Sequence, residues 1–493
     1  MPTADRGPRR PAPGGAGRRN VLLVVADQLR ADVLGCYGHP LARTPELDAL
    51  ARQGTRFDRH YSVCAPCGPA RASLLTGRYQ SAHGMLDNRT PVAAGTPTIA
   101  AHLTEAGTGC HVVGYTDTVA PQDGRETVPD GFSWHTRFNL SDAGLAEWLG
   151  HLAANGRPVP ANPVDILRPA PGTRNLARYP ARLSDTAFVA DRTIACMTER
   201  QDEPWCIVAT FLRPHPPWVA PAPYHAAHDP SLMASPHRLV SAAAEAERHP
   251  FLRYWLGRDC LDTAAADLTD EAVARHRATY LGLVAELDHH VGRLMSALRE
   301  LGRERDTLVV FTADHGDTLG DHWSLGTGGF RETAYRIPLI VRHPGRPGGS
   351  VVTGPTESVD VTATVLDWAG VPQLPHGHGS PLLPPGAGAA GPRPAAVQEF
   401  DFRDGSTGRP ERELGLRPEE CRLTVVRTAR HSYVHFPALD PLLFDREEDP
   451  GELRDLSRLP EFRRVLEYHA ELLEKHERRA SRPPGNRDRA ARR

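Results

Sequence analysis

The sequence contains few cysteines, no long apolar segment and no excess of charge of either sign. Of its eight cysteines only Cys64 and Cys67 lie close together, which does not indicate the disulfide framework of a small secreted domain. The 58 basic residues nearly balance the 60 acidic ones, so charge predicts neither nucleic acid nor an anionic membrane as partner. The apolar run from Val21 to Ala26 is far too short to span a bilayer.

No signal peptide is evident near the first residue. Arg9 and Arg10 are followed by Pro, Gly and Ala rather than by an apolar core, unlike a Sec or twin-arginine signal. This pattern favours a cytoplasmic protein. Basic residues gather in 1–19 and 476–493, where the composition predicts disordered tails.

Strands and helices alternate between residues 20 and 375. The run Asn20–Ala26 is continuously apolar, which is typical of a strand buried on both faces. We expect further strands and helices at 45–53 (helix, capped by Thr44), 98–106 (helix), 110–114, 185–198 (helix), 205–212, 271–301 (helix), 307–312 and 337–343. This alternation predicts an α/β catalytic domain over 20–375, with a mostly parallel central sheet sandwiched by helices. Residues 119–185 show no such pattern and are expected to be irregular.

The last quarter of the chain has a different pattern. Pro, Gly and Ala dominate 376–396, which predicts a linker. Beyond it we expect strands at 421–428, 432–435 and 442–444 and a closing helix at 461–473. These elements predict a smaller C-terminal α+β subdomain over 397–475, made of an antiparallel sheet plus a helix.

Three of the predicted strands end in polar side chains. They are Asp27 with Gln28, His215 a few residues after its strand, and Asp314 with His315. Open α/β sheets bind ligands at the carboxyl ends of their strands. Each residue alone is more often a helix cap or an ordinary polar group. Two carboxylates, an amide oxygen and an imidazole around one point nevertheless suit a divalent cation.

The segment around Cys67 opens a predicted helix in which Pro69 occupies an early position. Cys67 would lie just ahead of that helix, where unpaired N–H groups and the positive dipole end favour an anion. A thiol at such a place is expected to be reactive. A buried cysteine pair, or a redox pair of Cys64 and Cys67, is the alternative interpretation.

The order Cys67-x-Pro69-x-Arg71, followed by Leu75-Thr76-Gly77-Arg78, resembles the sequence that a formylglycine-generating enzyme recognises in sulfatases. Other segments that resemble this family are Val21–Leu29, Phe311–Gly320, Ser358–Gly370 and Pro441–Leu453. On these segments the chain is identified as a member of the sulfatase branch of the alkaline phosphatase superfamily. The resemblance implies an alkaline phosphatase-like fold, one divalent metal ion, and 3-oxoalanine (formylglycine) made from Cys67 by that maturation enzyme.

Within the branch, Arg213-Pro214-His215-Pro216-Pro217, Gln28 and Gly114-Tyr115-Thr116 look most like phosphonate monoester hydrolases, which also cleave phosphodiesters. The resemblance implies attack by the hydrated formylglycine on a small-molecule ester. It implies these metal ligands: Asp27, Gln28, modified Cys67, Asp314 and His315. His315 favours Mn²⁺ over Ca²⁺, with Mg²⁺ as a further alternative. Arg71 would hold the hydrate and His215 would donate a proton to the leaving oxygen.

Substrate contacts are expected from Asn88, Tyr115, Asp117 and Thr327. Two of these residues depart from the phosphonate monoester hydrolase subgroup. Thr327 occupies a position where the subgroup has a lysine, and Asp117 a position where the subgroup tends to have a hydroxyl residue. Loss of a cation and gain of a carboxylate both disfavour dianions such as phosphate monoesters. A sulfuric ester hydrolase is therefore a second hypothesis, and a weakly active anion- or metal-binding relative a third. A homo-oligomer is also expected from the subgroup.

Overall fold

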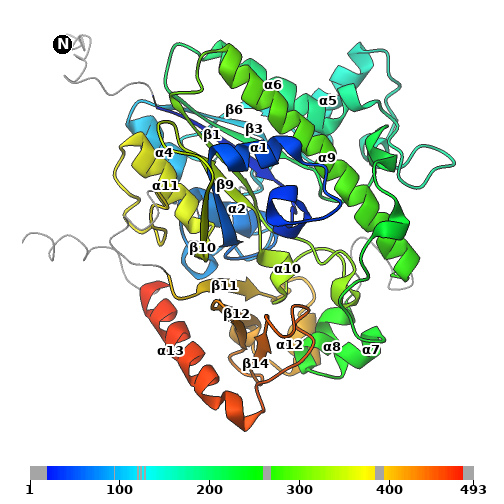
Figure 1. The fold of residues 1–493 in the computed structure, drawn as a ribbon, viewed down its shortest axis with the longest axis vertical. Helices are drawn as coiled ribbons and strands as arrows, with labels where there is room; N and C mark the ends of the chain where they lie inside the picture. Colours follow the sequence, from blue (N-terminus) through cyan, green and yellow to red (C-terminus); the bar gives the residue numbers. More distant parts are fainter. Residues whose placement is uncertain are drawn as a thin grey trace, which may run out of the picture.

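The computed structural model of the chain describes residues 19–93, 95–118, 121–122, 125–126, 129–258, 268–383 and 393–480. The chain forms a large α/β part and a smaller C-terminal part that packs against one end of it (Figure 1). The outer parts of both predicted tails, and residues 384–392 of the predicted linker, lie outside the described residues. None of the described helices is both long and apolar enough to cross a membrane.

The large part is built on a sheet of eight described strands in the order β10-β2-β9-β8-β1-β7-β3-β6. Their bounds are β1 Asn20–Ala26, β2 Thr55–Tyr61, β3 Gly109–Gly114, β6 Ser133–Arg137, β7 Trp205–Phe211, β8 Thr307–Ala313, β9 Leu339–Arg342 and β10 Ser350–Glu357. All neighbours are parallel except β9, which runs antiparallel to both β2 and β8. The prediction of a mostly parallel central sheet is confirmed.

Strand β1 lies at the middle of the sheet and supplies side chains to both faces. Its alternate residues Leu22 and Val24 join one hydrophobic core, while Val21 and Leu23 join the other. This follows from the period of two along a strand. It also explains why a strand buried on both faces reads as one apolar run.

Helices cover both faces of the sheet (Figure 1). One face carries α1 (Pro45–Gln53), α5 (Asp142–Ala154), α6 (Asp185–Glu199) and α9 (Asp270–Glu300). The other carries α2 (Cys67–Thr76), α4 (Ile99–Glu105) and α11 (Val359–Ala369). The sheet is therefore sandwiched by helices, as predicted.

The expectation that 119–185 is irregular was wrong. This segment supplies the edge strand β6, which pairs with β3, and helix α5, which packs its Trp148 into the core. Strand β6 was missed because its sequence is Ser-Trp-His-Thr-Arg, with most positions only partly buried and no apolar run. An edge strand that is half exposed need not carry a hydrophobic signal.

Thr44 is the N-cap residue of α1, as predicted, but its side chain does not cap the helix. Thr44 precedes the helix, but its hydroxyl accepts from the backbone of Gly35 and makes no capping hydrogen bond. Asp288, on α9, accepts from the first-turn amides of Glu46 and Leu47 instead. A tertiary contact thus replaces the local cap that the sequence indicated.

The C-terminal part contains an antiparallel sheet in the order β11-β12-β13-β14, as predicted. Its strands are Ala396–Asp401, Arg422–Arg427, His431–His435 and Leu442–Asp445. Helix α12 (Arg409–Leu414) and helix α13 (Arg463–Ala480) accompany the sheet. Helix α13 continues past the predicted end at 473 and includes residues 476–480, which had been assigned to a disordered tail.

Candidate active site

Helix α2 places Cys67 at the carboxyl end of the central strands. All ten residues of this helix are buried, and Cys67 is its first residue rather than the one before it. Figure 1 shows α2 near the centre of the large part. Gly68 has to be glycine, because a Cβ there would lie 2.7 Å from the carbonyl oxygen of Asp117. The start of the helix is therefore tightly packed.

Four buried side chains converge in front of this helix. The ligand atoms of Asp27, Cys67, Asp314 and His315 all lie within 4.8 Å of one another. Cys67 Sγ lies 3.1 Å from His315 Nε2 and 3.6 Å from Asp27 Oδ1. His315 Nε2 is 3.8 Å from Asp27 Oδ1 and 3.9 Å from Asp314 Oδ1. We call these four residues the metal-ligand cluster.

Arg71, one turn after Cys67, binds one oxygen of each of the two carboxylates, Asp27 and Asp314. It donates from Nη2 to Asp27 Oδ2 at 3.1 Å and from Nε to Asp314 Oδ2 at 2.9 Å. Each carboxylate thus gives one oxygen to Arg71 and turns its other oxygen toward the cluster. The guanidinium also lies over the ring of Tyr115, whose hydroxyl donates to Asp27 Oδ2.

Hydrogen bonds to further residues orient His315 and Gln28, the two remaining candidate metal ligands. His315 Nδ1 donates to the carbonyl of Gly316 at 3.0 Å, which leaves Nε2 as the atom that faces the cluster. The side-chain nitrogen of Gln28 donates to Asp317 at 2.5 Å, which leaves its amide oxygen as the available ligand atom. Its backbone amide donates to Asp314, and its carbonyl accepts from Tyr280.

The sequence alone gave no role to Asp317 and Tyr280. Asp317 directly follows Asp314, His315 and Gly316, so its position in that run was the available signal. Tyr280 lies inside the long helix α9, far from any motif, and no spacing pattern pointed to it. Both residues act on Gln28, which has a positive φ of 64° and therefore needs several contacts to hold it.

The ionisation of the cluster differs from the expectation of a reactive thiol. Burial raises the pKa of Cys67 well above its usual value, and the charges of Asp27, Asp314 and Asp117 add to this rise. Arg71 opposes it without overcoming it. Burial would also raise the pKa of Asp27, but His215, Arg71 and His315 together lower it below its usual value. The carboxylate is thus the anion here and the thiol keeps its proton.

This donor set fits a divalent cation. Two carboxylate oxygens and an imidazole nitrogen converge on one point, and the thiol position offers a further ligand. The contacts that orient the carboxylates and His315 are of the kind found around metal ligands in general. Four of the five residues that the sequence named as metal ligands are therefore brought together by the fold, and the role of Gln28 as a fifth ligand stays a prediction.

Asn88, Tyr115, Asp117 and His215 each interact with the cluster or with the start of α2. Asn88 is exposed, and its side-chain oxygen accepts from the Gly68 amide at 2.9 Å. Asp117 is partly buried, and its pKa is raised by burial to about 6 although Arg71 opposes the rise. His215 is partly buried and close enough for its charge to lower the pKa of Asp27. Tyr115 is buried, with its hydroxyl engaged by Asp27.

Thr327 lies twelve residues beyond His315 and has no direct contact with the cluster among those described. Its Oγ1 is buried and has no hydrogen-bond partner among the described residues. A buried hydroxyl without a partner is uncommon in folded proteins. Its contact with substrate, like those of Asn88, Tyr115 and Asp117, stays a prediction.

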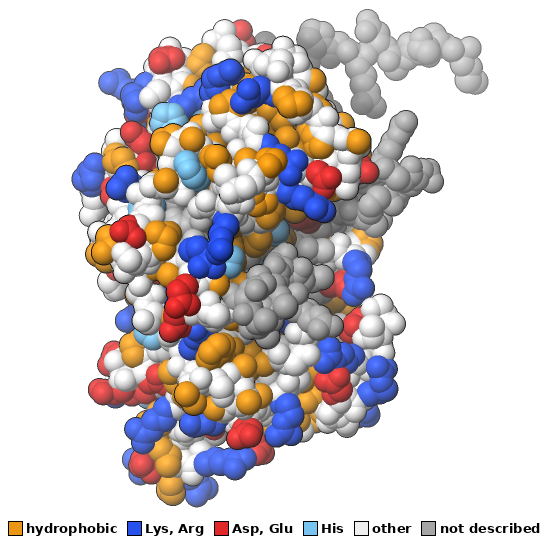
Figure 2. Space-filling model, turned by 90° about the vertical axis from the view of Figure 1, so that its right-hand side faces the viewer, with side chains coloured by type: hydrophobic (Ala, Val, Ile, Leu, Met, Phe, Trp, Pro, Cys, Tyr) orange, Lys and Arg blue, Asp and Glu red, His pale blue; other side chains and the backbone are white. Residues whose placement is uncertain are grey.

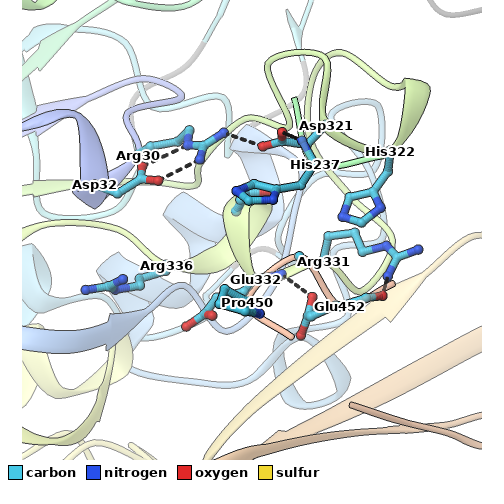
Figure 3. A pocket seen from close by; sticks show the side chains of 12 residues that line it. Arg30, Asp32, His237, Asp321, His322, Arg331, Glu332, Arg336, Pro450 and Glu452 are labelled. Atoms are coloured by element: carbon cyan, nitrogen blue, oxygen red, sulfur yellow. Dashed lines mark hydrogen bonds and ion pairs between the residues drawn. The ribbon is translucent and has the colours of Figure 1, made fainter. Parts of the chain in front are cut away.

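A second charged region lies between the large and the C-terminal parts. This interdomain cavity has a volume of about 190 Å³ and is lined by arginines, carboxylates and histidines (Figure 3). Its ionic groups pair with one another: Arg30 binds Asp32 at 2.6 Å and Asp321 at 3.0 Å. Glu452 accepts from Arg427 at 2.7 Å and from the amide of Glu332 at 3.0 Å. We therefore place the candidate active site at the metal-ligand cluster.

The molecular surface carries no comparable concentration of one charge on the face shown in Figure 2, where basic and acidic side chains are interspersed. This distribution follows from the near balance of the two signs in the sequence.

Comparison with known proteins shows the family to which the chain belongs. The sulfatase family model matches residues 19–371. The chain is 36% identical, over 92% of its length and 94% of the other, to the multifunctional alkaline phosphatase superfamily protein PehA of Trinickia caryophylli. It is 28% identical to a choline-sulfatase of Rhizobium meliloti, over 90% of this chain and 83% of the other.

Solved structures give the same result. The phosphonate monoester hydrolase of Agrobacterium radiobacter superposes with a TM-score of 0.88 at 37% identity, covering 94% of this chain and 96% of that one. The phosphonate monoester hydrolase of Silicibacter pomeroyi gives 0.87 at 36% identity, with the same coverage. The chain therefore belongs to the sulfatase family and is an ester-bond hydrolase.

Proposed function

We propose that the chain is a formylglycine- and metal-dependent hydrolase of phosphonate monoesters and phosphodiesters, with the hydrated formylglycine from Cys67 as nucleophile. The observation that carries this proposal is the position of Cys67 at the start of a buried helix, 3.1 Å from His315 and 3.6 Å from Asp27. The same position brings its side chain to the helix N-terminus, which favours anions. Likeness to two phosphonate monoester hydrolases supports the choice of substrate.

The metal would be held by the carboxylates of Asp27 and Asp314, the imidazole of His315 and the amide oxygen of Gln28. The nitrogen ligand favours Mn²⁺ over Ca²⁺, and Mg²⁺ is the other candidate. When bound, such a cation neutralises anionic oxygens and lowers the pKa of hydroxyl groups nearby. Arg71 keeps both carboxylates oriented for this purpose through its 2.9 Å and 3.1 Å contacts.

His215 is suited to protonate the leaving oxygen. Its Nδ1 lies 2.5 Å from the Pro216 carbonyl, an acceptor only, so Nδ1 carries a proton and Nε2 is left for the substrate. Proton donation by a well-placed group contributes about 10²–10⁴-fold to the rate. Asp117, with its pKa near 6, can accept a proton when the nucleophile is regenerated.

The charges at the site favour monoanionic esters. Asp117 adds a carboxylate beside the cluster, and Thr327 brings no cation to the position where the subgroup has a lysine. Like charges repel strongly in a partly desolvated site. Phosphodiesters and phosphonate monoesters carry one negative charge, whereas phosphate monoesters carry two near neutral pH.

Sulfate ester hydrolysis is the second candidate, because a sulfate monoester is also a monoanion of similar shape. The 28% identity to a choline-sulfatase favours it as an alternative. The absence of a lysine at Thr327 supports the third candidate, a weakly active anion- or metal-binding relative.

Mass spectrometry and paired rate measurements test the proposal. Peptides from the native producer should contain an aldehyde or its hydrate at Cys67, and the protein should hydrolyse 4-nitrophenyl phenylphosphonate faster than 4-nitrophenyl sulfate. An unmodified thiol, or a disulfide with Cys64, contradicts the mechanism. A preference for the sulfate ester would instead support the second candidate, a sulfate ester hydrolase.

The proposal also includes a maturation partner and a compartment. A formylglycine-generating enzyme would act on the Cys67 segment, and the protein would work in the cytoplasm on a small-molecule ester. Size-exclusion chromatography with light scattering tests the expected homo-oligomer.

A further inference from the structure

The loop that carries His215 is held from behind by a buried arginine. The Arg213 side chain is 0% exposed, and its Nε donates to Asp185 Oδ2 at 2.8 Å. Its Nη1 donates to the carbonyl of His215 at 3.2 Å and to that of Pro217 at 2.7 Å. One guanidinium therefore joins a buried carboxylate to the two carbonyls on either side of Pro216.

The carbonyl between them orients the imidazole. Pro216 O accepts from His215 Nδ1 at 2.5 Å, so the ring direction depends on the orientation of the peptide that Arg213 holds on both sides. Through this contact the conformation of the loop determines where His215 Nε2 points.

The carboxylate partner is itself fixed in the core. Asp185 is the first residue of α6 and is buried, and the Tyr179 hydroxyl lies 3.4 Å from its Oδ1. A second carboxyl, Glu286 on α9, is 0% exposed. Burial and the charge of Asp185 raise the pKa of Glu286 to about 8, although Ser184 and Arg213 oppose the rise. Asp185, which contacts the Arg213 guanidinium at 2.8 Å, is the buried carboxyl that anchors it.

We propose that Arg213, fixed by Asp185, is a positioning residue that directs the imidazole of His215 toward the leaving group. This rests on the proposed function, in which His215 donates a proton. A guanidinium suits the role because it presents donors in several directions of one plane, here to one carboxylate and two carbonyls. Lysine keeps the charge but lacks this planar fork, so Arg213→Lys separates geometry from charge.

The test compares leaving groups. Variants Arg213→Lys, Asp185→Asn and His215→Ala are assayed with the 4-nitrophenyl and the phenyl ester of phenylphosphonic acid, since the phenyl ester needs leaving-group protonation more. We expect His215→Ala to lower kcat about 10²-fold on the phenyl ester and less than about tenfold on the nitrophenyl ester. Arg213→Lys and Asp185→Asn should show the same selectivity, with about a tenfold larger loss on the phenyl ester.

Arg293→Lys is the matched control. Arg293 on α9 pairs with Asp191 at 2.6 Å near the surface, so it contacts α6, the helix that carries Asp185, without reaching the His215 loop. It should leave both rates unchanged. In a His215→Ala background, Arg213→Lys should no longer change the ratio of the two rates.

The outcomes separate the two hypotheses. Equal losses on both esters for Arg213→Lys, with His215→Ala selective, overturn the positioning role and leave the proposed function standing. A non-selective His215→Ala overturns the role of His215 as proton donor. If Arg213→Lys fails to fold, Asp185→Asn gives the same readout, because it keeps the guanidinium and removes only its anchor.

Discussion

The metal-ligand cluster and the interdomain cavity are both buried and rich in carboxylates, yet they use them differently. In the cluster, Asp27 and Asp314 share one guanidinium, and each turns its second oxygen toward the thiol and imidazole. In the cavity, Asp321 accepts from Arg30, Arg277 and the amide of His237. Burial and charge alone therefore do not identify a site. What distinguishes the cluster is that ligand atoms of four side chains lie within 4.8 Å of one another, an arrangement that recurs nowhere else among the described residues.

The largest effects are expected when one carboxylate is neutralised in each region, which tests whether the two regions differ in function. Asp314→Asn should lower kcat/KM by more than about 10³-fold, because it removes a metal ligand whose supporting contacts alone are worth 10–100-fold. Asp321→Asn should instead destabilise the fold by about 3 kcal/mol, because it leaves Arg30 and Arg277 with less compensation. Metal content by plasma mass spectrometry, activity per folded molecule and urea unfolding measure these effects.

Each variant serves as the control of the other. Asp314→Asn should lower the melting temperature of the metal-free protein less than Asp321→Asn does, since Arg71 retains Asp27 and the repulsion between the two adjacent carboxylates is removed. Asp321→Asn should keep activity per folded molecule within about tenfold. Retention of metal by Asp314→Asn would contradict the assignment of the cluster.

A smaller effect concerns Glu286, a buried carboxyl that belongs to neither region. Its pKa of about 8 means that the native protein holds a proton that the unfolded chain releases above about 4.5. Stability from this group is therefore present at low pH and is lost as pH rises toward 8. Urea midpoints of the wild type and Glu286→Gln should diverge between pH 5 and 8, with the wild type losing up to roughly 4 kcal/mol relative to the variant.

Parallel curves for the two proteins would show that Glu286 ionises normally. Glu271→Gln is a suitable control, because Glu271 is exposed in the first turn of the same helix. It should leave the pH dependence of the midpoint unchanged.

The smallest expected effect concerns the charge at position 327 and the preference for monoanionic substrates. Thr327→Lys should raise activity on a phosphate monoester relative to a diester by about tenfold, since a cation there offsets the second negative charge of the substrate. The measurement is the ratio of kcat/KM for 4-nitrophenyl phosphate and bis(4-nitrophenyl) phosphate. Thr327→Gln, which adds length without charge, is the control. An unchanged ratio in Thr327→Lys would place position 327 outside the substrate-binding region.

The sequence predicted those parts of the fold whose signal lies in one segment. Strands β1, β7 and β8 are apolar throughout because both their faces are buried, so their sequences show it. Strands β2 and β6 contain charged or polar residues at most positions and are recognised only through their neighbours. The role of Asp288 at the start of α1 was missed for the same reason, because Asp288 comes from more than two hundred residues away.

The candidate site divides in a similar way. Asp27, Asp314 and His315 follow apolar strands, so topology alone predicts that they meet. The helix start at Cys67 suggested an activated thiol, but burial, together with the charges of nearby carboxylates, raises its pKa. The support of Gln28 by Asp317 and Tyr280 depends on a positive φ that no sequence pattern indicates.

The burial of α2 also has a consequence in time. His315 is 248 residues after Cys67, and at about 5–20 residues per second its synthesis follows that of Cys67 by roughly 12–50 s. During that interval His315 and the residues around it have not been synthesised, so the segment from Cys67 to Thr76 is not yet buried. Once the sheet closes, every residue of that helix is out of reach. The enzyme that we propose to modify Cys67 would therefore compete with translation and folding, and slower synthesis should give a larger modified fraction.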